Sequence, residues 1–183
     1  EGLGPGHMAE LSAVNYCPRC GARLGQEERF GKRRPVCPAC GYVHFYDPKV
    51  AAAVFIQNNG RLLLIRRGVD PERGKWALPA GFVDYGEDPR QTAIREVREE
   101  TGLEVRITRL VDVFYSRREL GASIIIVYAA EVTGGALQPL DDAEAVRWFT
   151  PDELPELAFE STRRLVAAWV AEQRRAEDRP EAG

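Results

Sequence analysis

The stretch at residues 81–103 reads GFVDYGEDPRQTAIREVREETGL and ends in a dense group of acidic residues. Glu96, Glu99 and Glu100 are spaced i, i+3 and i+4, which places their carboxylates on one face of a helix. Like charges at this spacing destabilise an isolated helix by about 0.2–0.5 kcal/mol per pair. The pattern therefore indicates an external cation, and three hard oxygen ligands on a rigid face suit Mg²⁺ or Mn²⁺. The alternative interpretation is a solvated acidic helix.

The same stretch carries the signals of a complete helix. Asp88 is a favoured N-cap residue, and Pro89 follows at the first helical position, where its missing N–H has no cost. Gly102 is typical of the residue that ends a helix in the left-handed conformation. A second face of this helix is apolar and is expected to pack against a core, through Ala93, Ile94 and Val97.

The stretch resembles the Nudix box: Gly, five residues, Glu, seven residues, Arg-Glu, an aliphatic residue, one residue, Glu-Glu, one residue, Gly and an aliphatic residue. The fixed positions are here filled by Gly81, Glu87, Arg95, Glu96, Val97, Glu99, Glu100, Gly102 and Leu103. The resemblance covers about residues 48–172. It implies the α/β/α sandwich of that family, with a mixed sheet between helices.

The resemblance also implies roles for the box residues. Glu96 and Glu100 are expected to bind the catalytic Mg²⁺ or Mn²⁺, and Glu99 to bind it as well or to activate water. The carbonyl of Gly81 often completes the metal shell in this family. The expected orienting groups are Arg95 and Glu87.

Two kinds of residue lie outside the fixed positions of the box: the general base that would accept a proton from water, and the residues that would contact the nucleobase. Candidate bases are Glu119, on a loop between two expected strands, and Asp142, with Asp141 and Glu144 as competitors. For each of these residues taken alone, an ordinary surface acid is the favoured interpretation. Aromatic residues that could stack on a nucleobase, or belong to the core, are Phe82, Tyr85, Phe114 and Phe159.

Two Cys-x-x-Cys pairs precede the box, with sixteen residues between them: Cys17 and Cys20, then Cys37 and Cys40. This spacing is typical of a zinc ribbon, in which four thiolates close a tetrahedral Zn²⁺ site and leave no open position for catalysis. The predicted zinc is therefore structural. The alternative is two redox-active pairs. His44 is expected to be a packed or surface residue, since four thiolates already complete the site.

Lys32, Arg33 and Arg34 lie between the two cysteine pairs. They indicate either a nucleic-acid or phosphate-binding face or a solvated hairpin tip. The solvated tip is the favoured interpretation, because Phe30 is the one stacking aromatic residue in this part of the sequence.

The chain is expected to divide at its composition changes. Residues 1–7 resemble a cloning remnant, residues 15–45 the ribbon, residues 48–176 the Nudix domain and residues 177–183 a polar tail. Within the domain, VAAAVFIQ and RLLLIRR predict a hairpin about Asn58-Asn59-Gly60.

The composition predicts a folded cytoplasmic protein. The 183 residues are 44% hydrophobic and carry a net charge of −3, with no signal peptide and no apolar run long enough to span a membrane. A net charge of this sign gives no overall attraction to nucleic acid. A small nucleotide is the expected partner, and a homodimer is compatible with the sequence.

Two groups of Nudix proteins that contain a zinc ribbon indicate the class of substrate. NADH pyrophosphatases carry a Ser-Gln-Pro-Trp-Pro-Phe-Pro-x-Ser segment after the box, which the corresponding LVDVFYSRRELGASIII lacks. Plant FAD/ADP-ribose pyrophosphatases are more similar, at Asp47-Pro48-Lys49, at residues 78–82 and at residues 157–161. The expected reaction cleaves the pyrophosphate of FAD, ADP-ribose or NADH to a nucleoside monophosphate and the other phosphorylated half. The alternatives are hydrolysis of NAD-capped RNA and a non-catalytic ligand sensor with a nucleic-acid-binding ribbon.

Overall fold

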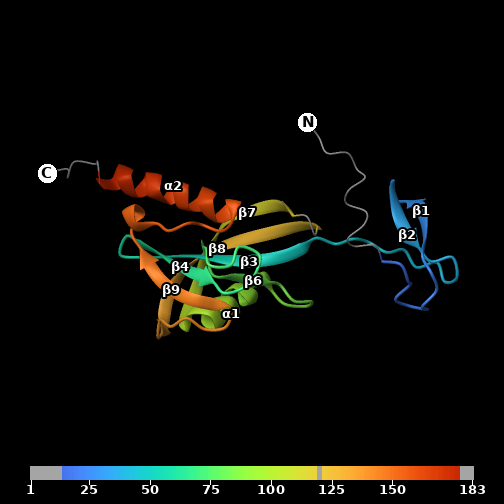
Figure 1. The fold of residues 1–183 in the computed structure, drawn as a ribbon, viewed down its shortest axis with the longest axis horizontal. Coiled ribbons are helices and arrows are strands. Elements are labelled where there is room, and N and C mark those ends of the chain that lie inside the picture. Colours follow the sequence, from blue (N-terminus) through green and yellow to red (C-terminus); the bar gives the residue numbers. More distant parts are fainter. Residues whose placement is uncertain (1–13, 119–120, 178–183) are drawn as a thin grey trace. The chain divides into compact units, whose positions relative to one another are not determined.

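The structure is a computed structural model that describes residues 14–118 and 121–177, with side chains described for residues 14–116 and 124–176 (Figure 1). It contains two compact units. One unit comprises Glu1–Lys49 with Ser116–Ser123, and the other Val50–Tyr115 with Ile124–Gly183. In the part of the chain that is described, no helix has both the length and the apolar character needed to cross a membrane.

The first unit contains a small antiparallel hairpin of β1 (Gly25–Arg29) and β2 (Lys32–Val36). The turn residues Phe30 and Gly31 both have positive φ, at 53° and 69°. On either side of the hairpin, each cysteine pair forms the same tight loop. The amides of Gly21 and Gly41 donate to the carbonyls of Cys17 and Cys37 at 2.9 and 3.0 Å. Both glycines have a φ of 73°, which residues with a β-carbon rarely adopt.

The second unit is built on a seven-stranded sheet. Its order is β5-β4-β3-β8-β7, with β6 paired to β3 and β9 paired to β4. The strand bounds are β3 (Lys49–Asn58), β4 (Arg61–Arg67), β5 (Trp76–Ala77), β6 (Ala80–Phe82), β7 (Leu103–Arg118), β8 (Gly121–Gly135) and β9 (Ala143–Phe149).

The predicted turn at Asn59-Gly60 is confirmed, but the hairpin that it closes is short. Asn59 and Gly60 have φ values of 48° and 68°, as a two-residue hairpin turn requires. Antiparallel pairing of β3 with β4 is limited to Gln57–Leu62 and Asn58–Arg61. Farther along, β3 pairs with β6 at Ala51–Ala53, while β4 pairs along its length with β9. The two strands therefore separate soon after the turn.

Helices cover both faces of the sheet, as the sequence predicted for this fold class. α1 (Pro89–Thr101) and α2 (Glu160–Glu177) lie on opposite sides of it, and the short 3-10 helix η1 (Pro151–Glu153) precedes α2 (Figure 1). Alternate residues of the central strands divide between the two layers. On β3, Val54 and Ile56 belong to the core that includes α1, while Ala53 and Phe55 belong to the core that includes α2.

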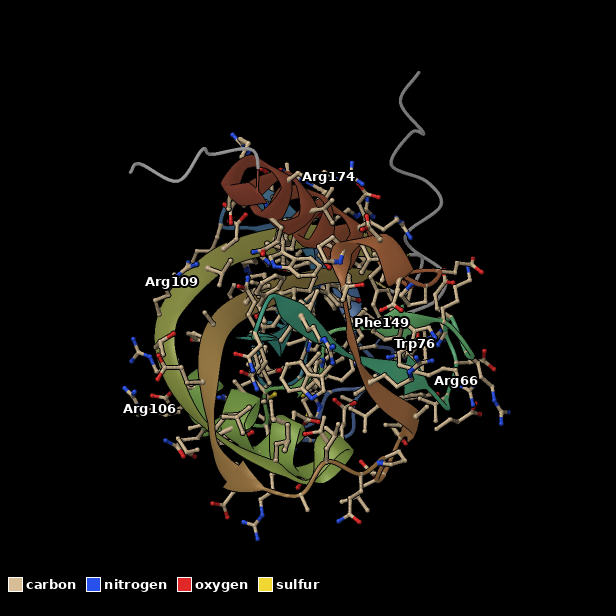
Figure 2. All side chains as sticks on the ribbon, turned by 90° about the vertical axis from the view of Figure 1, so that its left-hand side faces the viewer. Arg66, Trp76, Arg106, Arg109, Phe149 and Arg174 are labelled. Carbon is tan, nitrogen blue, oxygen red and sulfur yellow. The ribbon has the colours of Figure 1, made fainter. Side chains whose placement is uncertain are left out.

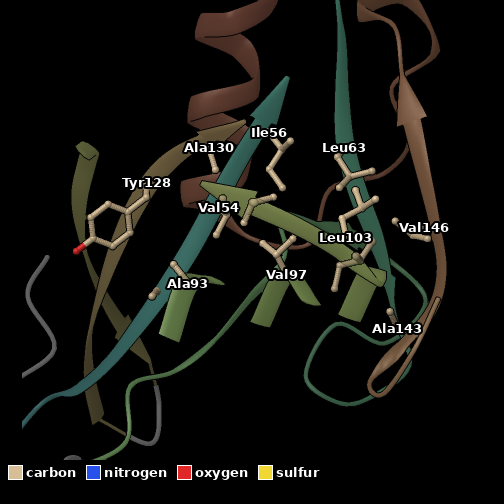
Figure 3. Close-up of a cluster of buried hydrophobic side chains, with 13 residues drawn as sticks. Val54, Ile56, Leu63, Ala93, Val97, Leu103, Tyr128, Ala130, Ala143 and Val146 are labelled. Carbon is tan, nitrogen blue, oxygen red and sulfur yellow. The ribbon is translucent and has the colours of Figure 1, made fainter. Parts of the chain in front are cut away.

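The α1-side core holds the acidic helix against the sheet. Ala93 and Val97 of α1 are fully buried and pack with Val54 and Leu63 of the central strands (Figure 3). Burial of apolar surface contributes roughly 25 cal/mol per Å², so this face gives α1 a fixed position. The opposite, acidic face of the helix is positioned as a consequence.

Candidate active site and cysteine cluster

α1 begins and ends where the sequence predicted. The Asp88 carboxylate accepts a hydrogen bond from the Arg90 amide at 2.7 Å, and Pro89 is the first helical residue. At the other end, Gly102 has a φ of 69°, and its amide donates to the Arg98 carbonyl at 3.0 Å. These caps fix which residues of the helix face β6.

Arg95 connects the acidic residues of this site. Its guanidinium donates to both Glu87 oxygens at 2.9 and 3.1 Å, to Glu96 Oε1 at 2.7 Å and to Glu99 Oε2 at 2.9 Å. It also donates to the Phe82 carbonyl at 3.3 Å. One planar cation therefore holds three carboxylates and the end of β6, which offsets the repulsion among the carboxylates.

Arg95 holds Glu87 in its ionised form. Its hydrogen bonds to Arg95 are the main reason that its pKa is lowered to about 2, and the Asp84 amide also donates to it at 3.3 Å. In the same pairing the pKa of Arg95 is raised. The pair remains charged at all pH values of interest, which suits a positioning role.

Glu100 has the opposite environment. It is 4% exposed and accepts a hydrogen bond from the Ala80 amide at 2.9 Å. Burial raises its pKa to about 8, because a carboxylate loses hydration there. A buried carboxylate of this kind is stabilised in its charged form by a cation, so Glu100 is suited to be a metal ligand.

Gly81 is required by the position of Glu96. A β-carbon built on Gly81 would overlap the Glu96 carboxylate, so any other residue would displace that carboxylate. Glu96 is itself partly buried, and desolvation raises its pKa. The backbone of β6 and the acidic face of α1 are therefore in direct contact at this glycine.

These residues provide the donor set of a hard divalent ion. Carboxylate and carbonyl oxygens are the ligands that Mg²⁺ and Mn²⁺ prefer. The glutamates are not gathered around one point, however, because Glu96 and Glu99 bind Arg95 while Glu100 binds the Ala80 amide. Within residues 14–116 and 124–176, the four cysteines are the one group of three or more His, Cys, Asp or Glu side chains whose donor atoms are close enough together to hold a metal ion, all within 4.8 Å of one another.

The predicted four-cysteine cluster is confirmed. The sulfur atoms of Cys17 and Cys40 are 3.6 Å apart, those of Cys20 and Cys37 3.5 Å, and those of Cys20 and Cys40 3.6 Å. A tetrahedral ion with metal–sulfur bonds of about 2.3 Å requires sulfur separations of about 3.8 Å. The short separations join one pair to the other, which favours one shared metal site over two redox pairs.

The comparisons with known proteins agree with this arrangement. The family described as NUDIX domain matches residues 47–170. The chain belongs to the Nudix hydrolase family. An ADP-ribose pyrophosphatase from Methanocaldococcus jannaschii is 40% identical over 121 residues, 65% of this chain and 72% of the relative.

Two further relatives extend the match. An NAD-capped RNA hydrolase, NudC, from Stutzerimonas stutzeri is 30% identical over 164 residues, 88% of this chain and 56% of the relative. This chain thus spans little more than half the length of that protein. The crystal structure of a NUDIX hydrolase from Nitrosomonas europaea superposes with a TM-score of 0.80 at 29% identity, covering 88% of this chain and 93% of the other.

The candidate general bases of this Nudix hydrolase lie in different surroundings. The charges of Asp141 and Asp142 contribute to the raised pKa values of Glu96 and Glu100, so both aspartates lie near the acidic face. Glu144 instead forms ion pairs with two arginines, Arg66 at 3.5 Å and Arg73 at 3.3 Å. Glu119 lies outside the described residues.

The aromatic candidates are also separated. Phe82 and Tyr85, next to the box, are 52% and fully exposed. Phe114 is buried in the α2-side core, and Phe159 lies under the Arg67 guanidinium, 4.9 Å from its ring centroid. Phe82 and Tyr85 are therefore the two that present a ring to solvent.

Two features of the site lacked a clear signal in the sequence. The amide of Ala80 is a backbone group, so its hydrogen bond to Glu100 depends on the local path of β6. Trp76 packs edge-on against Phe149 of β9, with ring centroids 4.8 Å apart, and Figure 2 shows the two rings together. This contact joins residues more than seventy positions apart and fixes the segment that leads into the box.

Proposed function

We propose that the Nudix domain hydrolyses the pyrophosphate bond of a nucleoside diphosphate derivative such as ADP-ribose or FAD, with NADH as a further member of the class. The products are a nucleoside monophosphate and the other phosphorylated half. The observation that carries the proposal is the contact of the acidic face of α1 with β6, where Glu96 lies against Gly81 and Glu100 is buried beside Ala80. The similarity to an ADP-ribose pyrophosphatase supports the substrate class.

Each box residue has a role in this proposal. Glu96, Glu100 and the Gly81 carbonyl hold the divalent ion, Mg²⁺ or Mn²⁺. When bound, such an ion offsets the negative charge of the pyrophosphate. Glu99, which is half-exposed, accepts a proton from the attacking water or completes the ligand set. Arg95 and Glu87 keep these groups in place.

Other residues complete the proposed site. Asp142 is the candidate general base outside the box, with Asp141 beside it; both lie near the acidic face. Phe82, the last residue of β6, and Tyr85 offer exposed rings to a nucleobase. The four-cysteine cluster binds Zn²⁺, which stabilises the ribbon and takes no part in hydrolysis.

A hydrolysis screen tests the reaction and the substrate class together. FAD, NADH, NAD⁺, ADP-ribose, diadenosine polyphosphates and nucleoside triphosphates are each incubated with Mg²⁺ or Mn²⁺, and products are separated by chromatography. We expect AMP from one or more of the first four, and a fall of about 10²–10³ in turnover for Glu99→Gln or Glu100→Gln. Near-normal turnover in both folded variants would contradict the assignment.

A second candidate reaction is the hydrolysis of NAD-capped RNA. The observation that favours it is the extent of the NudC match, which covers 88% of this chain and so includes part of the sequence before the Nudix domain. The bond cleaved is the same, with RNA attached to the leaving half. Competition between NAD-capped RNA and ADP-ribose, compared as kcat/KM, distinguishes the two substrates.

A further inference from the structure

At the tip of the ribbon hairpin, Phe30 exposes its aromatic ring and has an unusual backbone conformation. Phe30 has a φ of 53° at the first turn position and is 76% exposed. Two-residue hairpin turns of this type favour Asn-Gly or Asp-Gly, because bulky residues are rarely left-handed. Phe30 at this position therefore lowers the local stability of the turn. Because its ring is exposed, burial of the side chain does not compensate for that cost.

A second aromatic residue joins Phe30 through the fold. The strands at Val36 and Val43 form an antiparallel bridge, and the His44 amide donates to the Pro35 carbonyl at 2.9 Å. This pairing brings the residues after the second cysteine pair alongside β2. Phe45, which is 44% exposed, consequently stacks on Phe30 with ring centroids 5.8 Å apart.

A guanidinium group continues this stack. The Arg34 guanidinium lies 4.5 Å from the centroid of the Phe45 ring, and its Nε donates to the Arg29 carbonyl at 3.3 Å. We call Phe30, Phe45 and Arg34 the ribbon platform. The premise that Phe30 is the one stacking aromatic residue of this region was wrong, because Phe45 also stacks there. Phe45 reaches Phe30 through the pairing of Val43 and His44 with β2, which is a tertiary contact.

The charge around the ribbon platform is positive. Residues 14–46 contain six Lys or Arg and two Glu, whereas the whole chain has 25 basic and 28 acidic residues. Four thiolates around one divalent ion contribute a charge of −2, so the ribbon retains a positive charge when it is metal-bound. Among the described residues, neither Lys32 nor Arg33 has a carboxylate within ion-pair distance, whereas Glu27 pairs with Arg29 at 2.7 Å.

We propose that the ribbon platform binds single-stranded nucleic acid. Bases stack on the Phe30 and Phe45 rings and on the planar Arg34 guanidinium, while phosphates lie near Lys32, which shares the face of Arg34 on β2. Exposed rings beside unpaired cations are the combination by which proteins bind single strands without reading their sequence. An acidic peptide would use the cations but not two stacked, exposed rings. The inference does not depend on which pyrophosphate the Nudix domain cleaves.

Binding is measured by fluorescence anisotropy on the zinc-loaded full chain, without added Mg²⁺ or Mn²⁺. The probes are a 12-nucleotide oligouridylate RNA, an oligothymidylate DNA of the same length and a 12-base-pair duplex. We expect the single strands to bind more tightly than the duplex. Two or three phosphate contacts give a slope of about −1.4 to −2.1 for log K against log salt concentration. The ratio of RNA to DNA affinity identifies which strand the ribbon prefers.

Two substitutions separate stacking from folding. Phe30→Asn removes the ring and supplies the Asn-Gly turn that this hairpin geometry favours. Phe45→Leu keeps an apolar side chain and removes the stacking face. We expect each to weaken single-strand binding about fivefold or more, with one zinc retained per chain. The matched control is Tyr115→Asn, which removes a 66% exposed aromatic residue from the other unit and is expected to leave binding unchanged.

Each of the following results would overturn the proposal. They are wild-type affinity in both Phe30→Asn and Phe45→Leu, equal affinity for duplex and single strands, and a loss with Tyr115→Asn as large as with Phe30→Asn. An absence of single-strand binding at low salt would do so as well. None of these results bears on hydrolysis of a small substrate, so the two proposals can fail separately.

Discussion

The environment of Glu100 differs strongly from that of a carboxyl group in water. It is buried, and its pKa of about 8 lies well above that of a carboxyl in an unfolded chain. The folded state therefore holds a proton that the unfolded state has already released at neutral pH. Two measurable consequences follow at this residue.

The first consequence concerns stability in the absence of Mg²⁺ and Mn²⁺. As the pH rises from about 5 to 8, the unfolded chain loses the Glu100 proton while the folded chain keeps it, so the free energy of unfolding decreases. The slope for one proton is about 1.4 kcal/mol per pH unit. Glu100→Gln should remove this pH-dependent decrease in the free energy of unfolding. Urea unfolding of the zinc-loaded proteins between pH 5 and 8 should therefore show a larger decrease for the wild type than for the variant. Parallel pH profiles would contradict the assignment.

The second consequence concerns metal affinity. A divalent ion bound by the Glu100 carboxylate must displace its proton, so affinity for Mg²⁺ should rise with pH up to about 8, by as much as about tenfold per unit. Isothermal titration calorimetry in buffers of different ionisation enthalpy measures the released proton directly. In Glu99→Gln, which keeps Glu100, the proton release should persist. Mg²⁺ binding without proton release near pH 7 would show that Glu100 is not a ligand.

Gly81 gives a steric test at the same scale. A β-carbon in Gly81→Ala would displace the Glu96 carboxylate, and misplacement of a catalytic group by about 1 Å can reduce turnover about 10²-fold. Gly25→Ala is the matched control, since its β-carbon would meet its nearest atom, the Val36 carbonyl oxygen, at an ordinary 3.8 Å. Steady-state hydrolysis and thermal unfolding distinguish the two. Full activity in Gly81→Ala would show that Glu96 is free to move.

At the scale of elements, α1 shows how much local sequence can determine. Its N-cap, first residue and C-terminal glycine were predictable because each depends on neighbours within four positions. The contacts that form the site join residues much farther apart in the sequence. The Ala80 amide reaches Glu100 across twenty positions, and the pairing of β4 with β9 joins residues about eighty positions apart. Neither has a periodic or compositional signal.

The cap of α1 can be tested by itself. Asp88→Ala removes the acceptor of the Arg90 amide and should lower the free energy of unfolding by about 1 kcal/mol. Asp88→Asn keeps a capping oxygen and should retain most of the stability. Urea denaturation of the three proteins gives the comparison. Equal losses in both variants would assign the effect to the Asp88 charge instead of the cap.

At the scale of the whole molecule, the two compact units have separate sources of stability. The ribbon has few buried apolar residues and depends on its cysteine cluster, whereas the Nudix unit has two apolar cores, one on each face of its sheet. Small folds of the first kind generally require their metal.

Loss of one cysteine ligand should therefore affect the units unequally. Cys37→Ser is expected to reduce zinc from about one per chain to near zero and to remove the hydrogen-exchange protection of β1 and β2. The protected amides of β3 and β4 should persist. His44→Ala, which leaves all four thiolates, should retain zinc. Retained zinc in Cys37→Ser, or its loss in His44→Ala, would identify a different ligand set.

The position of β4 in the sheet also has a consequence for the chain as it is synthesised. Leu62, Leu63, Leu64 and Ile65 are all fully or almost fully buried, yet β9, along which β4 pairs, ends at Phe149. At 5–20 residues per second, a ribosome needs about 4–16 s to pass from the end of β4 to the end of β9. During that interval four consecutive aliphatic residues of the nascent chain lack their final cover. A chaperone that binds short apolar segments would find a binding site here during that interval.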